Sequence, residues 1–119
     1  MKHINGYCAV LAITYASGLP ESQVVDMCRW HGFVDNGAGM YDDDWLAAAK
    51  DLGIRLRRVK TKAKTVGGFL KEHPLGTFLV GTEGHLFAVL NGGMVNHPIQ
   101  SNTDRRCKVQ EAWRVLKAK

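Results

Sequence analysis

The chain has few cysteines, few prolines and no long hydrophobic run. Its 3 cysteines are an odd number without paired spacing, which argues against a disulfide framework and favours free thiols in a reducing compartment. No stretch approaches the roughly 18 continuous apolar residues of a membrane helix, so no membrane partner is expected. The apolar run from Cys8 to Ile13 is short and lacks a distinct cleavage site, unlike a signal peptide. We therefore expect a cytoplasmic protein.

Acidic residues are also scarce relative to basic ones. The 119 residues include 16 Lys and Arg against 11 Asp and Glu, which gives a formal net charge of +5. The basic residues cluster at 55–64 and 105–119, and such clusters attract acidic proteins or nucleic acid over long distances. The hydrophobic share of 45% is typical of a globular protein, and the length suits one domain over residues 1–119.

The first half of the chain is predicted to be helical. Small and apolar residues at helical spacing predict a helix over 8–17 that ends at Gly18, and a second helix that begins at Pro20 and ends at Gly32. A loop is expected at 37–40. The stretch YDDDWLAAAKDLG predicts a third helix, in which Asp42 to Asp44 supply the N-cap and favourable charge in the first turn.

The second half is predicted to be mostly sheet. Ile54 to Val59 suits a short strand, and 65–74 suits a short helix capped by Thr65. Two strands follow at 76–82 and 85–90, and the NGG turn at 91–93 connects the second of them to another strand at 94–98. The segment 107–116 has the pattern of a last strand, which also permits a helix. Helices first and antiparallel strands second indicate the α+β class.

A cysteine and a histidine stand at the starts of two such elements. Cys8 begins the first predicted helix, and His85 begins a core strand far along the chain. When such residues meet across a helix–sheet boundary, the imidazole activates the thiol. A helix N-terminus and an adjacent imidazolium lower the pKa of a thiol to about 3.5–7.5. We therefore expect a nucleophilic ion pair.

A third group is expected to orient the histidine ring. Asn96 and His97 follow the hairpin and are both placed to accept the second imidazole N–H. Asn96 is the favoured residue, because an amide oxygen accepts that proton without a tautomer requirement. Asn5 is the nearby amide for an oxyanion hole, together with the backbone N–H of Cys8.

Three stretches carry a resemblance to a known family: NGYCAVLAITYASGLP, LGTFLVGTEGHLFAVLNGGMVNHP and EAWRV. They resemble small phage and bacterial proteins with a papain-like cysteine-peptidase fold and, more remotely, peptidase domains that cut double-glycine leaders. The resemblance implies that Cys8 is the nucleophile, His85 the base and Asn96 the orienting residue. It implies a peptidase or isopeptidase without a cofactor, acting on a protein or peptide in a host cytoplasm or in a virion.

Each of these residues also has a purely structural interpretation. Cys8 suits a small buried position, His85 a strand edge where the ring binds a carbonyl, and Asn96 the flank of a turn. Two weak sequence patterns contain residues that bind metals: Cys28 with His31 on one helix, and Cys8 with His85 and His97. We expect no metal, because Cys28 continues an apolar stripe and no second ligand pair has suitable spacing.

Two classes of function remain open from the sequence. The first is the cysteine hydrolase, whose catalytic groups would serve a transferase or a deamidase equally well. The second is a binding protein of the same fold with little or no catalysis, whose basic clusters engage a host protein or nucleic acid. The oligomeric state has no signature in the sequence.

Overall fold

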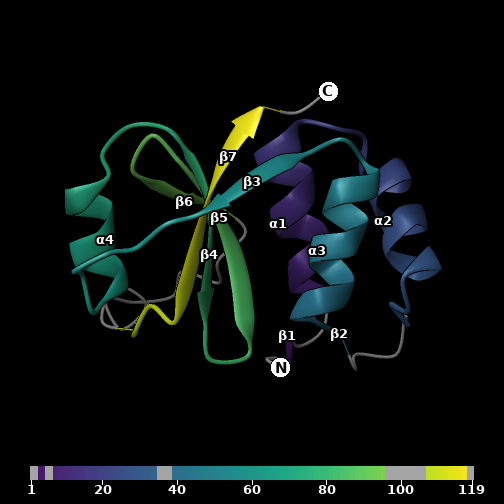
Figure 1. The fold of residues 1–119 in the computed structure, drawn as a ribbon, viewed down its shortest axis with the longest axis horizontal. Coiled ribbons are helices and arrows are strands. Elements are labelled where there is room, and N and C mark those ends of the chain that lie inside the picture. Colours follow the sequence, from purple (N-terminus) through teal and green to yellow (C-terminus); the bar gives the residue numbers. More distant parts are fainter. Residues whose placement is uncertain (1–2, 5–6, 35–38, 96–106, 118–119) are drawn as a thin grey trace.

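The computed structural model describes residues 3–4, 7–34, 39–95 and 107–117, which form an α+β fold (Figure 1). The helices and strands lie in the following order: β1 (His3–Ile4), α1 (Cys8–Ser17), α2 (Glu21–Trp30), β2 (Met40–Tyr41), α3 (Asp42–Asp51), β3 (Arg55–Arg58), α4 (Val66–Glu72), β4 (Thr77–Thr82), β5 (His85–Leu90), β6 (Gly93–Val95) and β7 (Glu111–Lys117). The expected α+β class is confirmed.

The helix ends follow the residues that predicted them. α1 ends at Gly18, which adopts a φ of 75° and donates its N–H to the carbonyl of Thr14. Pro20 is the N-cap of α2, one position before the helical position expected for it. Thr65 is the N-cap of α4, and its hydroxyl accepts the N–H of Gly68. Local chemistry therefore sets these boundaries.

The start of α3 differs from the prediction. The N-cap is Tyr41, which makes no side-chain cap, and Asp42 lies inside the first turn. There the Asp42 carboxylate accepts a hydrogen bond from the indole Nε1 of Trp45 at 2.9 Å. The expected N-cap role is wrong, whereas the favourable first-turn charge of Asp42 to Asp44 is present.

The loop expected at 37–40 is also partly wrong. Met40 belongs to β2, which pairs with β1 through Ile4 opposite Met40 and His3 opposite Tyr41. Strands of two residues are too short to show an alternating pattern. Their pairing holds the segment before α1 against the segment before α3.

The main sheet is antiparallel, with the strand order β3-β7-β4-β5-β6. A turn at 83–84 joins β4 to β5, and Gly84 supplies its positive φ of 70°. Asn91 and Gly92 have φ angles of 48° and 83° in the turn before β6, as the NGG stretch predicted. β7 is a strand, and it lies between β3 and β4. The last segment of the chain therefore completes the middle of the sheet.

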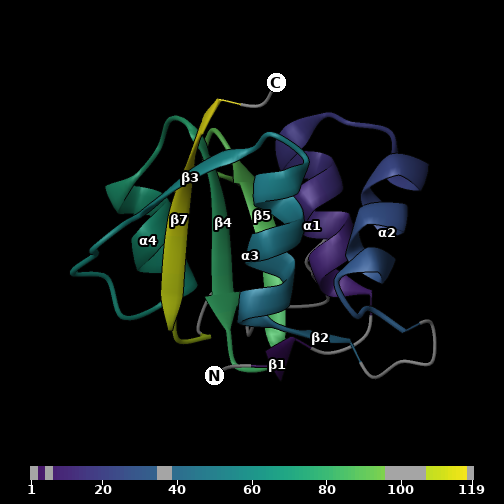
Figure 2. The ribbon, with the colours of Figure 1, turned by 45° about the vertical axis from the view of Figure 1, so that its right-hand side comes forward.

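Both faces of this sheet are buried (Figure 2). One face packs against α1 and α3, with α2 packed on these two helices, and its sheet residues are Leu79, Leu86, Ala88 and Trp113. The other face packs against α4, and its sheet residues are Phe78, Val80, Phe87, Val89 and Ala112. The alternation of these side chains along each strand separates the two cores. The N-terminal helices cover one face only.

No helix in the described part of the chain is long and apolar enough to span a membrane.

Candidate active site

Cys8 is the first residue of α1 and is half-buried. The helix is fixed against the sheet by a fully apolar inner face, made of Ala9, Val10, Ala12 and Ile13. Just before it, the hydroxyl of Tyr7 donates to the Glu21 carboxylate at 2.6 Å, and the Tyr7 ring lies 5.8 Å from the Phe33 ring. These contacts tie the start of α1 to α2 and to the segment after it.

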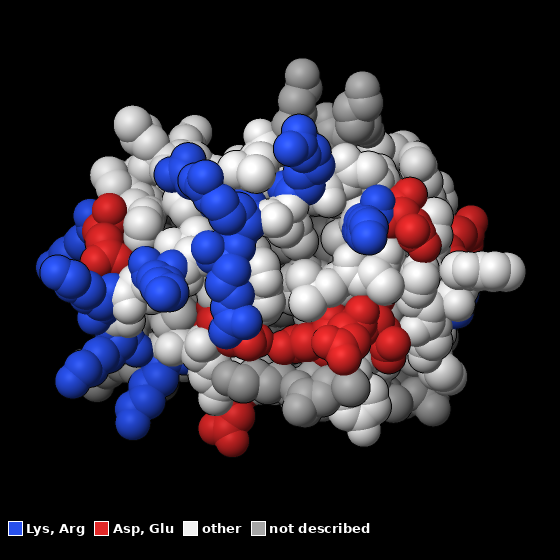
Figure 3. Space-filling model, in the orientation of Figure 1, with Lys and Arg blue, Asp and Glu red and all other residues white. Residues whose placement is uncertain are grey.

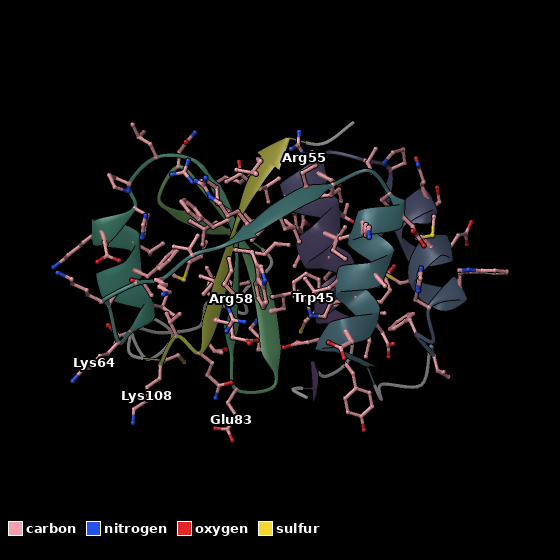
Figure 4. All side chains as sticks on the ribbon, viewed as in Figure 1. Trp45, Arg55, Arg58, Lys64, Glu83 and Lys108 are labelled. Carbon is pink, nitrogen blue, oxygen red and sulfur yellow. The ribbon has the colours of Figure 1, made fainter. Side chains whose placement is uncertain are left out.

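His85 is the first residue of β5 and follows the turn at 83–84 directly. Glu83 in that turn marks the end of the sheet at which His85 lies (Figure 4). The imidazole stacks on the ring of Phe87 with centroids 6.0 Å apart, and its Nε2 atom is buried. His85 pairs with Thr82 across the hairpin. The turn and the strand together fix the position of the ring.

The structure brings these two residues into contact. Sγ of Cys8 lies 2.9 Å from Nδ1 of His85, although 77 positions separate them in the chain. The contact forms because α1 packs on the sheet with its N-terminus beside the start of β5. Its length is that of a hydrogen bond between the thiol and a ring nitrogen.

Two backbone groups also point at the sulfur. The N–H of Leu86 donates to Sγ, and the N–H of Cys8 itself lies close enough to favour negative charge on the sulfur. Leu86 pairs with Gly81 of β4 on one side, and the described residues of β6, Gly93 to Val95, pair with Ala88 to Leu90 on the other. The Leu86 donor is not predictable from the sequence, because a backbone N–H carries no residue signature.

The electrostatic environment of the sulfur opposes the thiolate of the expected ion pair. Burial raises the pKa of the Cys8 thiol above its ordinary value, and the two N–H groups offset only part of this shift. The desolvation of the sulfur thus outweighs the donors that favour a thiolate. This shift works against the expected ion pair, because it favours the thiol over the thiolate.

Three residues expected at the site lie outside the described residues. Asn96 follows Val95, the last described residue of β6, and His97 is the next position. Asn5 precedes Cys8 by three positions. Their roles as orienting residue and oxyanion donor stay predictions.

The residues of the first metal pattern have structural partners. Cys28 is fully buried in the core beside α1 and α3, and burial raises the pKa of its thiol to about 11. Nε2 of His31 lies 2.7 Å from the carboxylate of Asp51. Among the described residues, no group of three or more His, Cys, Asp or Glu side chains is placed to hold a metal ion. The alternative set with His97 lies partly outside those residues.

Comparisons of the chain with protein-family models, with curated proteins and with solved structures gave no match.

Proposed function

We propose that the chain is a papain-like cysteine hydrolase, a peptidase or isopeptidase with Cys8 as nucleophile and His85 as base. One observation carries the proposal: Sγ of Cys8 lies 2.9 Å from Nδ1 of His85 at the N-terminus of a buried helix. A cysteine that served only for packing would not require an imidazole at hydrogen-bond distance. The contact joins two elements that are far apart in sequence, and nucleophile–base pairs are commonly built in this way.

In the proposal the chemistry starts from a neutral pair, in which the Cys8 thiol donates a hydrogen bond to Nδ1 of an uncharged imidazole. The thiol proton moves to Nδ1 of His85 as Sγ attacks a carbonyl carbon, and a tetrahedral intermediate forms. The protonated imidazole then gives this proton to the leaving amine, which leaves a thioester on Cys8. Water loses a proton to Nδ1, attacks the thioester and releases the carboxylic acid, and the thiol regains its proton.

The N–H groups at the sulfur suit this sequence of steps. The Leu86 N–H stabilises the charge that develops on Sγ as the proton leaves. In the proposal, the backbone N–H of Cys8 and the amide of Asn5 hold the oxygen of the tetrahedral intermediate. Loss of one such donor costs about 2.7–4 kcal/mol of transition-state stabilisation.

Asn96 completes the proposed triad. While Nδ1 of His85 accepts a hydrogen bond from the thiol, the neutral ring carries its proton on Nε2, which is buried. An amide oxygen from Asn96, which directly follows β6, would accept that proton and hold the ring in this tautomer. We place the reaction in a cytoplasm, which is a host cytoplasm if the chain is phage-encoded.

A fluorogenic peptide library tests this function. Peptides that release a coumarin amine are offered to the wild type, Cys8→Ala, His85→Gln and the control Cys107→Ala, in which a different half-buried thiol is removed. We expect cleavage by the wild type and the control, and a loss of at least about a hundredfold in the first two variants. Circular dichroism checks that each variant is folded.

The proposal is wrong if cleavage survives both Cys8→Ala and His85→Gln. It is also wrong if the folded wild type neither cleaves any peptide nor forms an adduct with a peptide vinyl sulfone at Cys8. In that case, the chain is better explained as a binding protein of the same fold.

A further inference from the structure

A row of basic side chains runs along one edge of the main sheet. It consists of Arg55, Arg57, Arg58, Lys60, Lys62 and Lys64, and we call it the basic row. All six are exposed, and beyond β3 they alternate with the half-buried Val59, Thr61 and Ala63. β3 is the terminal strand in the order β3-β7-β4-β5-β6, so the row begins at an edge of the sheet.

Two carboxylates, those of Glu111 and Glu72, lie against the six cations of the basic row; Glu72 accepts hydrogen bonds from the hydroxyl of Thr61 and from the backbone N–H of Lys62. No acidic residue occurs from 55 to 64. Arg58 pairs with Glu111 at 3.0 Å, whereas the other five members form no ion pair with any described residue. Like charges that stand side by side repel each other, so their alignment is costly unless an anion neutralises them.

The surface beyond the row is also basic. Lys64 lies next to Thr65, which forms a β-bridge with Lys108, and the N–H of Val109 donates to the carbonyl of Lys64. Arg55, Arg58, Lys64 and Lys108 extend from β3 toward the α4 side of the molecule (Figure 4). Figure 3 shows Lys and Arg gathered over this half, and Asp and Glu mostly over the half that carries α2 and α3. The charge is therefore separated across one face.

A groove borders the basic row. Its volume is about 670 Å³, and it lies between residues 58–63 of the row segment and residues 109–112. The groove begins where β3 and β7 separate: the last backbone contact between them joins Val59 to Ala112. Arg58 and Lys60 line one side of it, and Gln110 and Glu111 line the other, where Glu111 is already paired with Arg58.

The row lacks the aromatic groups that other partners would use. The exposed large hydrophobic side chains of the described residues include three aromatics, Tyr15, Trp30 and Tyr41, which lie on α1, α2 and β2. Protein interfaces depend on buried aromatic anchors, and single-stranded nucleic acid stacks its bases on aromatic rings. Phosphate contacts on a duplex need cations alone.

We propose that the basic row binds the phosphate backbone of duplex nucleic acid. The surface is separate from the catalytic pair, because β7 and β4 lie between β3 and β5, a distance of about 14 Å at the usual strand spacing. Contacts to phosphates place a protein on a duplex without reading its sequence. The binding is therefore independent of base sequence and leaves the Cys8 site open.

Fluorescence anisotropy with a short fluorescein-labelled duplex DNA tests the proposal. If the five unpaired cations contact phosphates, the slope of log affinity against log salt is about −4 to −5 between about 50 and 200 mM NaCl. The double variant Lys60→Gln/Lys62→Gln loses about 2 from the magnitude of this slope, and its affinity at the low-salt end falls at least about tenfold, for any duplex sequence.

The matched control is Arg29→Gln/Lys50→Gln, which removes the same charge from α2 and α3. We expect it to change binding little, and we expect Cys8→Ala to bind DNA like the wild type. Unchanged binding by Cys8→Ala would show that DNA binding does not depend on the proposed catalytic site. DNA binding that persists in a chain without hydrolytic activity would overturn only the enzyme.

Four outcomes would overturn the proposal. Equal weakening by the two double variants would mean that net charge alone attracts DNA. Displacement of the duplex by polyglutamate at equal charge concentration would point to an acidic protein. Tighter binding of a single strand would point to base contacts. No binding at about 50 mM NaCl would leave the row as protection of a sheet edge against pairing with other chains.

Discussion

The indole ring of Trp45 on α3 packs edge-on against the indole ring of Trp113 on β7. Their centroids are 4.9 Å apart and the planes stand at 88°. Trp45 is fully buried, and its Nε1 donates to the carboxylate of Asp42. This aromatic pair joins the helical half of the chain to β7, inside the sheet. We therefore expect the hydrogen bond from Trp45 to Asp42 to contribute to the free energy of unfolding.

Replacement of Asp42 tests that point. Asp42→Ala leaves the buried indole N–H of Trp45 without its acceptor, and we expect a loss of about 1–3 kcal/mol in the free energy of unfolding. Urea denaturation measures the loss. Asp42→Asn keeps an acceptor oxygen and should lose less. The control Asp43→Ala removes an exposed first-turn charge, and an equal loss there would show that Asp42 acts only through the helix dipole.

The pH dependence of alkylation tests the neutral Cys8–His85 pair. In the wild type we expect iodoacetamide to modify Cys8 near neutral pH, because Nδ1 of His85 can take the thiol proton as the sulfur attacks the reagent. In His85→Ala the base is gone and burial still raises the pKa of Cys8, so modification should require a clearly more alkaline pH than in the wild type. Mass spectrometry of the modified peptides gives both profiles.

Cys28 is the internal reference for this measurement. Its thiol is buried and has a pKa of about 11, so it should stay unmodified throughout the neutral range in both proteins. Identical Cys8 profiles with and without His85 would contradict the role of the imidazole as base.

Replacement of Gly84 tests whether the turn at 83–84 positions the His85 ring. Its φ of 70° strains any L side chain, so Gly84→Ala should lower the free energy of unfolding by about 1–2 kcal/mol and shift His85 from the sulfur. Gly18→Ala is matched to it, since Gly18 has a φ of 75° at the end of α1 and open space around it. Both variants should lose similar stability in thermal or urea unfolding.

Only Gly84→Ala should slow the alkylation of Cys8 at neutral pH. If Gly18→Ala slows it equally, general loosening of the fold rather than the position of His85 explains the effect.

Local chemistry was sufficient to predict much of the fold. Gly18 ends α1, Thr65 caps α4, and Asn91 with Gly92 forms the hairpin turn, because each acts on its own backbone or on that of its near neighbours. The pairing of Cys8 with His85 was also accessible, because both chemical types are rare and each begins an element.

Features that depend on distant contacts were not predictable in this way. β1 and β2 are too short for a pattern and exist only because they pair with each other. The place of β7 between β3 and β4 has no local signal. The raised pKa of Cys8 depends on how deeply the finished fold buries the sulfur, and the Leu86 donor depends on how α1 packs beside the start of β5.

The central place of β7 has a consequence for synthesis on the ribosome. Cys8 emerges early and His85 much later, but β4 and β3 lack their common neighbour until residues 111–117 have left the exit tunnel. Until then β3 has no partner strand, and Trp45 has no indole to pack against. The nascent chain therefore cannot finish folding in the order in which it is made, and the sheet that carries His85 is complete only after β7 has emerged.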